Sequence, residues 1–199
     1  DRRAFVYMSN DNGKSFRKIG GADAKKRAYD EHMVLELKDD VLAMYMRTEY
    51  GIAVSYSYDR GRTWTQGIDS GLGGPCARFH IRRLKSGRIL MINHYQFVGR
   101  DHLTAMLSED EGKTWKYKLL LDERADVSYP DAKEADDGYI YITYDRERGA
   151  FKNSMEEAFS DAREILIAKI TEADIIAGGI TDEGSKLKFV ASKLGKYEN

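Results

Sequence analysis

A short turn sequence occurs three times in the chain and restricts its possible folds more than any other feature. Each copy reads Ser-x-Asp-x-Gly-x-Ser/Thr followed by Phe or Trp, and the copies lie at residues 9–16, 57–64 and 108–115. Their aspartates recur at intervals of about 50 residues, which is typical of a repeat architecture. The sequence therefore predicts an internal repeat with one such turn in each of these units.

The eight-residue turn has the composition of a tight connection between two strands. Its Asp carboxylate can accept hydrogen bonds from nearby backbone N–H groups, and its Gly can adopt the left-handed conformation that other residues resist. The hydroxyl residue and the aromatic residue are then expected to begin the next strand, with the ring turned toward a core. A repeat of about 50 residues has room for four short strands, which is the size of a propeller blade.

The first copy also has some features of a calcium-binding loop, because Asp11-Asn12-Gly13 is rich in oxygen atoms. It lacks the spaced ligands and the closing bidentate Glu of an EF-hand, so a structural role is favoured. The four histidines of the chain have no close pairing. The sequence therefore predicts no metal site and no cofactor.

The three turns resemble the Asp-boxes (BNR repeats) of the sialidase superfamily, whose members are six-bladed β-propellers. This resemblance implies an all-β fold of the sialidase type, to which the chain contributes roughly three and a half four-stranded blades. We expect a partial blade at 1–28, full blades at 31–75 and 78–122, and a last blade without an Asp-box at 125–199. Closing such a ring requires either further sequence before Asp1 or a second copy of the chain, because an open propeller leaves unpaired sheet edges.

Charge and composition narrow the possible partners. The net charge is −1, with 32 basic and 33 acidic residues, which argues against binding to nucleic acid or to an anionic membrane surface. The single cysteine, Cys76, excludes a disulfide within the chain. No apolar run approaches the ~20 residues of a membrane-spanning helix, and there is no signal-peptide pattern. We expect a soluble protein, with a cytoplasmic, periplasmic or secreted location left open.

Alternating and apolar segments predict the individual strands. They lie at residues 4–8, 33–37, 41–46, 52–56, 78–84, 88–94, 103–107, 139–144 and 164–170, with a last strand around 187–191. Two segments depart from this pattern. Residues 153–162 are polar with a helical pattern, and Thr171 begins a capped helix that Gly178 and Gly179 end.

The resemblance also implies a chemistry. A sialidase substrate carries a carboxylate on its anomeric carbon, and the family holds it with a clamp of three arginines. That carboxylate would repel a carboxylate nucleophile, whereas a neutral Tyr hydroxyl activated by a Glu avoids the repulsion. A separate Asp serves as acid and base on the leaving group. The substrate implied is thus a glycan that ends in sialic acid or a related acidic sugar.

Four residues match this arrangement by their position in the repeat. Glu31 and Arg47 are similar to the family's Glu-containing strand and its second clamp arginine, and Arg100 lies where the family places its third arginine. Tyr129 lies in a segment that resembles the nucleophile segment, with Glu31 as its base. Pro130 is expected to hold Tyr129 in an extended conformation. On residue type alone, each of these side chains also fits a structural role at a sheet edge, in a loop or between blades.

The sequence departs from the family pattern at several points. No residue matches the first clamp arginine or the acid Asp. Conversely, the sequence has polar residues that the family pattern does not require, at Arg78, His80 and His94. They are candidates to contact the glycerol or acyl end of the sugar, or a different acidic sugar. Each of the three alone also fits a structural role. Cys76 has no matching His pattern and is a weak candidate for a nucleophile.

The sequence is therefore compatible with three functions. The first is a retaining exo-sialidase or a related glycosidase, which the order and spacing of the four matching residues favour. The second is a carbohydrate-binding propeller without hydrolysis, which the missing acid and arginine favour. The third is a scaffold propeller that binds proteins, since Asp-boxes also occur in such domains.

Overall fold

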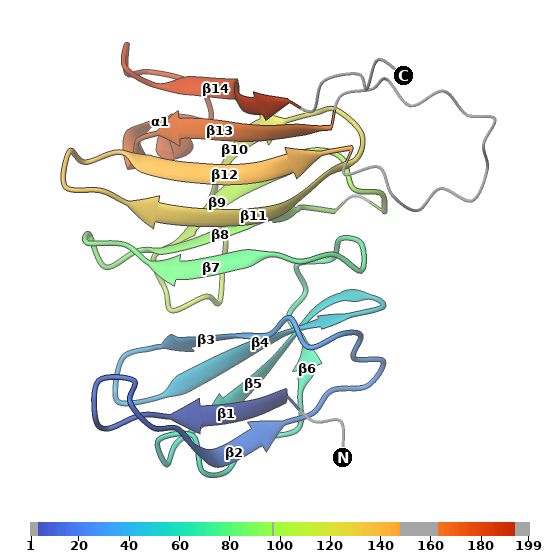
Figure 1. Ribbon diagram of the computed structural model, residues 1–199, viewed down its shortest axis with the longest axis vertical. Coiled ribbons are helices and arrows are strands. Elements are labelled where there is room, and N and C mark those ends of the chain that lie inside the picture. Colours follow the sequence, from blue (N-terminus) through green and yellow to red (C-terminus); the bar gives the residue numbers. More distant parts are fainter. Residues whose placement is uncertain (1–3, 97, 148–162, 194–199) are drawn as a thin grey trace. The chain divides into compact units, whose positions relative to one another are not determined.

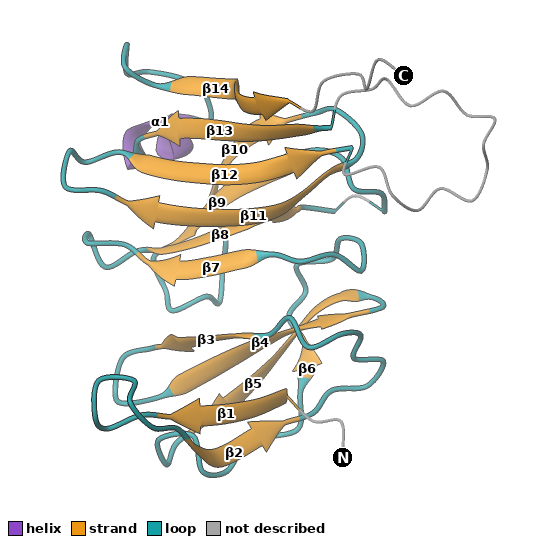
Figure 2. Ribbon diagram, in the orientation of Figure 1, coloured by secondary structure: helices purple, strands orange, loops and turns teal. Residues whose placement is uncertain are grey.

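The computed structural model describes residues 4–96, 98–147 and 163–193, and it is almost entirely β-structure (Figures 1 and 2). The chain divides into two compact units, Asp1–Cys76 and Ala77–Asn199. Among the described residues no helix is long and apolar enough to cross a membrane.

The first unit contains a hairpin and a four-stranded antiparallel sheet. The hairpin pairs β1 (Ala4–Met8) with β2 (Arg17–Ala22). The sheet has the order β3-β4-β5-β6, with strands at Met33–Glu36, Leu42–Thr48, Gly51–Ser57 and Ile68–Asp69. Small alanines from the hairpin side pack against two buried methionines of β4, so the hairpin can lie close to the sheet.

The second unit contains two further four-stranded antiparallel sheets. The first has the order β10-β9-β8-β7, with strands at Tyr117–Asp122, Leu103–Ser108, Ile89–His94 and His80–Arg83. The second has the order β11-β12-β13-β14, with strands at Val127–Glu134, Ile140–Arg146, Glu164–Ile170 and Lys186–Lys193. Within each sheet, neighbours in space are neighbours in sequence, which is the arrangement of a propeller blade.

One continuous apolar core joins the two sheets of the second unit. It contains Leu90, Ile92 and Leu107 from the first sheet and Ile142 and Leu166 from the second, all without exposed surface. Every second residue of β13 is buried, as expected when one face of a strand covers a core. The prediction of an all-β fold with four-stranded blades is confirmed by these sheets.

A short helix follows β13, as the sequence predicted. Helix α1 spans Glu172–Ala177, with Thr171 as its N-cap and Gly178 at φ +72° as its C-cap. A capping box forms because Thr171 Oγ1 accepts from the Asp174 N–H and the Asp174 carboxylate accepts from the Thr171 N–H. The helical segment predicted at 153–162 lies outside the described residues.

All three repeated turns form the same hydrogen-bond arrangement. In the second copy, Asp59 accepts from the Thr63 N–H at 2.8 Å and the Thr63 hydroxyl at 2.6 Å, while Ser57 Oγ accepts from the Gly61 N–H at 2.8 Å. The other two copies repeat these bonds at 2.6–2.9 Å. Gly61 has the predicted left-handed φ of +85°. The Thr63 hydroxyl, followed by its backbone N–H, lowers the pKa of Asp59 to about 2.

The hydroxyl residue and the aromatic residue of each repeated turn do not begin the next strand, so that prediction was wrong. The strands β2, β6 and β10 begin only after the aromatic residue, because the Ser or Thr N–H donates to the Asp instead of to a neighbouring strand. The ring of Trp64 packs partly against the core of the first unit, as expected. Phe16 instead is 66% exposed.

Candidate functional site

Arg47 lies near the C-terminal end of β4 and is held by the residues around it. It is 4% exposed. Its Nη1 donates to Glu31 Oε2, its Nη2 donates to the Cys76 carbonyl at 2.7 Å, and its Nε donates to Cys76 Sγ at 3.3 Å. The sequence predictions for Glu31 and Arg47 thus fall on two side chains that are in direct contact.

The guanidinium of Arg47 is also covered by an aromatic ring. Its Cζ lies 4.2 Å from the ring centroid of Tyr29, which is itself 68% exposed. Burial lowers the pKa of Arg47, but the bonds to Glu31 and Cys76 outweigh this effect, and the pKa is raised. The arginine is therefore a fixed cation with an aromatic ring over its guanidinium.

Tyr129 occupies a β-bulge of β11. Ser128 pairs with Asp145 and Asp131 with Thr143, so two residues of β11 lie opposite the single residue Tyr144. Tyr129 has φ +53°, so the prediction of an extended conformation was wrong. Pro130 disfavours the right-handed helical conformation for Tyr129. The extra residue of a bulge also departs from the extended conformation, and Tyr129 adopts the left-handed one. A left-handed conformation is strained for a tyrosine.

Two arginines flank the Tyr129 ring. The Arg78 Cζ lies 6.0 Å and the Arg100 Cζ 5.7 Å from its centroid. Arg78 has a weak ion pair with Asp131 at 3.8 Å, whereas Arg100 has no ion pair with any carboxylate that the structure describes. The structure thus brings the candidate residues Arg78, Arg100 and Tyr129 together, and within this cluster the only ion pair found among the described residues is that of Arg78 with Asp131.

Arg100 is tied to the strand that carries Tyr129. Its carbonyl accepts from the Val127 N–H at 3.0 Å, and its Nη1 donates to Ser128 Oγ at 3.2 Å. Ser128 Oγ in turn donates to Asp145 Oδ1 at 3.2 Å. Sequence reasoning missed Ser128 and Asp145, although both lie in the segments that resemble the family's nucleophile region.

His80 and His94 lie on the face of the β7–β8 pair that packs against the second sheet. Burial lowers the pKa of the His80 imidazole to about 4, although the Asp131 carboxylate, 3.0 Å from its Nδ1, acts in the opposite direction. His94 has no exposed surface, and burial lowers its pKa as well. Its Nδ1 donates to the Asp101 carbonyl at 2.9 Å, which makes its Nε2 a hydrogen-bond acceptor. Within the described part of the chain, neither Nε2 has a hydrogen-bond partner.

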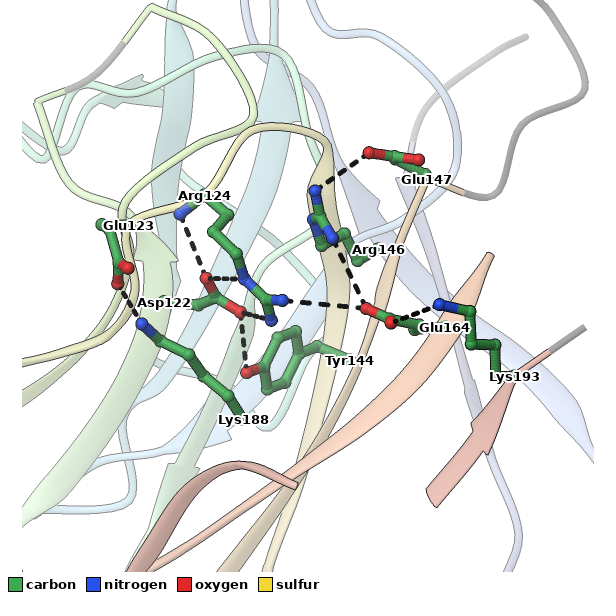
Figure 3. A network of polar contacts seen from close by, with 9 residues as sticks. All are labelled: Asp122, Glu123, Arg124, Tyr144, Arg146, Glu147, Glu164, Lys188 and Lys193. Carbon is green, nitrogen blue, oxygen red and sulfur yellow. Dashed lines mark hydrogen bonds and ion pairs between the residues drawn. The ribbon is translucent and has the colours of Figure 1, made fainter. Parts of the chain in front are cut away.

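The residue opposite the bulge belongs to a buried polar network (Figure 3). Tyr144 donates its hydroxyl to Asp122 Oδ2 at 3.0 Å, and Asp122 accepts two bonds from the Arg124 guanidinium, at 2.9 and 2.6 Å. Farther along, Glu164 has ion pairs with Arg124 at 3.8 Å and with Arg146 at 3.5 Å. These contacts hold the side chain of Tyr144, the residue opposite the bulge, in place.

The predicted residues thus form two groups. Glu31 and Arg47 belong to the first unit, whereas Tyr129, Arg100 and their neighbours belong to the second. The predicted pairing of Tyr129 with Glu31 joins these units and stays a prediction. Sequence reasoning also missed Tyr29 as the cover of Arg47, and it gave Cys76 no role as a hydrogen-bond partner.

Comparison with known proteins agrees with this fold. The family model for the BNR repeat-like domain matches residues 1–142. A comparison with curated protein sequences gives no match.

Among solved structures, the chain is similar to the Hadza microbial sialidase Hz136, with 28% identity and a TM-score of 0.63 over 71% of this chain and 29% of that one. It is similar to the leech intramolecular trans-sialidase, with 20% identity and a TM-score of 0.66 over 86% of this chain and 28% of that one. The NanB sialidase from Streptococcus pneumoniae has 23% identity and a TM-score of 0.60 over 71% of this chain and 24% of that one. The chain therefore spans less than a third of the length of each.

The repeated turns, the blade-like sheets and the family match all agree. The chain belongs to the BNR repeat-like domain family and has the β-propeller fold of the sialidase superfamily.

Proposed function

We propose that the protein is a glycosidase of the sialidase type, which releases a terminal acidic sugar from a glycan. The observation that carries this proposal is Tyr129, a strained tyrosine on a bulge with two guanidinium groups beside its ring. The proposal includes the division into blades at 1–28, 31–75, 78–122 and 125–199.

The charge around Tyr129 fits an anionic substrate. Arg100 is partly buried and has no carboxylate partner among the described residues, so it has donors to offer to a ligand carboxylate. Arg47 would provide a second clamp arginine. Arg78, His80 and His94 would contact the rest of the sugar, or hold the residues that do.

The proposed reaction uses Tyr129 as the nucleophile. Its hydroxyl oxygen attacks the anomeric carbon, its proton passes to Glu31, and the glycosidic bond breaks to leave a sugar bound to Tyr129. Water then attacks the same carbon, and the bond between that carbon and the Tyr129 oxygen breaks. The tyrosine recovers its proton from Glu31, and the proton of the water passes to the group that protonated the leaving group. The leaving group needs a proton from an acid for which this sequence offers no match.

A carbohydrate-binding function without hydrolysis is the second candidate, and the first unit favours it. Glu31, the proposed base, already forms an ion pair with Arg47, and Arg47 is further held by Cys76. A carboxylate that is already paired with Arg47 is well placed to orient a clamp arginine, which is a role in binding. The scaffold function has no comparable observation in its favour.

The test compares Tyr129→Phe with wild type on a fluorogenic N-acetylneuraminic acid glycoside. Tyr58→Phe is the control, because Tyr58 is 72% exposed and lies in a different unit. We expect Tyr129→Phe to reduce turnover by about 10³-fold or more, while the control keeps it. Unchanged turnover in Tyr129→Phe would refute the proposed nucleophile.

Binding is measured separately, by calorimetry with free N-acetylneuraminic acid. Binding by Tyr129→Phe and wild type alike, with no turnover by either, would establish the second candidate. Arg100→Met is expected to weaken this binding about 10-fold to 100-fold, because it removes a charged hydrogen-bond donor. If the acidic sugar binds neither wild type nor variants, both candidates fail.

A further inference from the structure

Arg100 is attached at two points to β11, the strand that carries Tyr129. Its carbonyl accepts from the Val127 N–H at 3.0 Å, and its Nη1 donates to Ser128 Oγ at 3.2 Å. Val127 has no exposed surface and Ser128 is 2% exposed, so both contacts are made to a packed part of the strand. The position of the Arg100 guanidinium, whose Cζ lies 5.7 Å from the centre of the Tyr129 ring, is therefore set by β11.

The Ser128 hydroxyl accepts from Arg100 while its own proton is directed to a carboxylate. A serine hydroxyl has one proton to donate and two lone pairs that accept. Ser128 Oγ donates to Asp145 Oδ1 at 3.2 Å, and Asp145 is also the residue that pairs with Ser128 between β11 and β12. Side chains of such cross-strand pairs lie close together, so the register of the sheet brings the carboxylate to the serine. The hydrogen bonds thus run in one direction, from Arg100 through Ser128 to Asp145.

A serine placed between an arginine and a carboxylate orients the guanidinium without occupying it. A carboxylate in direct contact takes up one or two of the five N–H donors and competes with an anionic ligand for the charge. Arg47 illustrates this case, because its Nη1, Nη2 and Nε all donate to Glu31 or Cys76. The side-chain contact of Arg100 with Ser128 uses Nη1, and its acceptor is neutral. Arg100 is therefore the better placed of the two arginines to bind an anion.

The orientation of a long side chain contributes to affinity. An arginine side chain has about 2 kcal/mol of rotamer entropy, part of which is lost when a ligand fixes it. A side chain that is already fixed in the free protein does not lose this entropy on binding. Contacts that hold Arg100 in place should therefore increase its affinity for a carboxylate, although they do not touch the ligand.

We infer that Ser128 and Asp145 are positioning residues, which hold the Arg100 guanidinium in the orientation that binds the carboxylate of an acidic sugar. The identity of this ligand rests on the proposed function. Ser128 acts through its hydroxyl oxygen, and Asp145 acts by fixing the direction of the hydroxyl proton. Because both residues act through Arg100, their removal should have no effect on binding once Arg100 itself is absent.

The first experiment needs no ligand and measures the order of the Arg100 side chain. In the whole chain with ¹⁵N-labelled arginine, the heteronuclear NOE of the Nε–H group reports its motion on the ps–ns timescale, and Arg100→Met assigns the resonance by its loss. We expect Ser128→Ala and Asp145→Ala to lower this NOE, whereas Asp145→Asn, which still accepts the serine proton, keeps it. Ser192→Ala is the control, because Ser192 is exposed on β14 of the same sheet. An unchanged NOE in Ser128→Ala would overturn the inference, and an unchanged NOE in Asp145→Ala would overturn the role of Asp145.

The second experiment measures the dissociation constant for free N-acetylneuraminic acid by calorimetry. Ser128→Ala should raise it about tenfold, and the same change in an Arg100→Met background should leave it unchanged. An equal rise in both backgrounds would show a general structural role and would overturn the inference. Asp145→Ala and Asp145→Asn provide the same comparison without altering the buried Ser128, and urea unfolding checks that each variant is folded.

The two experiments separate this inference from the proposed function. If wild type does not bind the acidic sugar, the proposed function fails, and the NOE still decides whether Ser128 orders Arg100. If wild type binds the sugar and both backgrounds respond alike to Ser128→Ala, the proposed function stands and the positioning role is refuted.

Discussion

Replacing Tyr144 by Phe removes one hydroxyl from the buried network and leaves the packing of the ring intact. Tyr144 is 2% exposed and donates to Asp122, which is fully buried. A hydrogen bond to a charged group contributes about 1.5–3 kcal/mol. Since Asp122 keeps its two bonds from the Arg124 side chain, we expect a loss near the lower end, about 1.5 kcal/mol.

Asp122→Asn should cost more, because it breaks the pair with Arg124 instead of removing a neutral donor. Breaking a buried ion pair costs about 3–5 kcal/mol. Arg124 is 30% exposed and stays within 3.8 Å of Glu164, so we expect about 3 kcal/mol. The two variants together should lose less than the sum of the single losses, because they share one hydrogen bond.

The assay follows unfolding of the second unit in urea. The chain has two tryptophans, and Trp115 is the one in this unit, so all variants are prepared in a Trp64→Phe background. Trp115 fluorescence then reports the midpoint and slope of the transition. A Tyr144→Phe variant as stable as its parent would refute the energetic role of the hydroxyl, and equal losses for both single variants would refute the role assigned to the ion pair.

The pH dependence of the same variants tests whether the ionised Asp122 carboxylate stabilises the fold. Burial raises the pKa of Asp122, but the bonds from Arg124 and Tyr144 outweigh this, and the pKa is lowered. A carboxyl group whose folded pKa is lowered stabilises the protein above its unfolded pKa of about 4, and this stabilisation is lost as the pH falls through the folded pKa. The difference between parent and Asp122→Asn should therefore shrink in acid.

Three further predictions concern the fold. The hydrogen bonds that lower the Asp59 pKa to about 2 stabilise the fold above pH ~4, so Asp59→Asn should lower the urea midpoint at neutral pH and differ less from wild type near pH ~2. Asp174 is fully buried and accepts bonds from the residues around α1, so Asp174→Asn should cost about 3 kcal/mol in urea unfolding, whereas the exposed Glu183→Gln is neutral. Gly51→Ala would place a Cβ 2.5 Å from a backbone oxygen and should lower the melting temperature more than Gly138→Ala, which meets no atom within 4 Å.

The sequence predicted the regular parts of the fold well, because they depend on local patterns. The strands follow from alternating or continuously apolar segments, and the turns from the Ser, Asp and Gly of each box, whose bonds span at most four residues. Helix α1 followed from Thr171 and Gly178 for the same reason. The strands after the boxes begin later than predicted. At these positions a local hydrogen bond to the Asp competes with strand pairing.

The candidate residues were chosen from their position in the repeat, and their roles stay predictions. The structure places Arg100 beside Tyr129 and Arg47 in contact with Glu31. The left-handed conformation of Tyr129 depends on a bulge. A bulge arises where two paired strands differ by one residue, so the sequence of one strand alone does not reveal it. The contact of Arg47 with Cys76 joins residues far apart in sequence and has no motif.

The repeated turns have one more consequence, for the order of folding. Every bond inside a box joins residues two to four positions apart, and Phe16, at the end of the first copy, completes its turn while largely exposed to water. Such contacts close small loops and need no other part of the chain, so they can form before the sheets. Each box can thus bring two strand ends together early, and the blades would assemble around hairpins whose ends already meet.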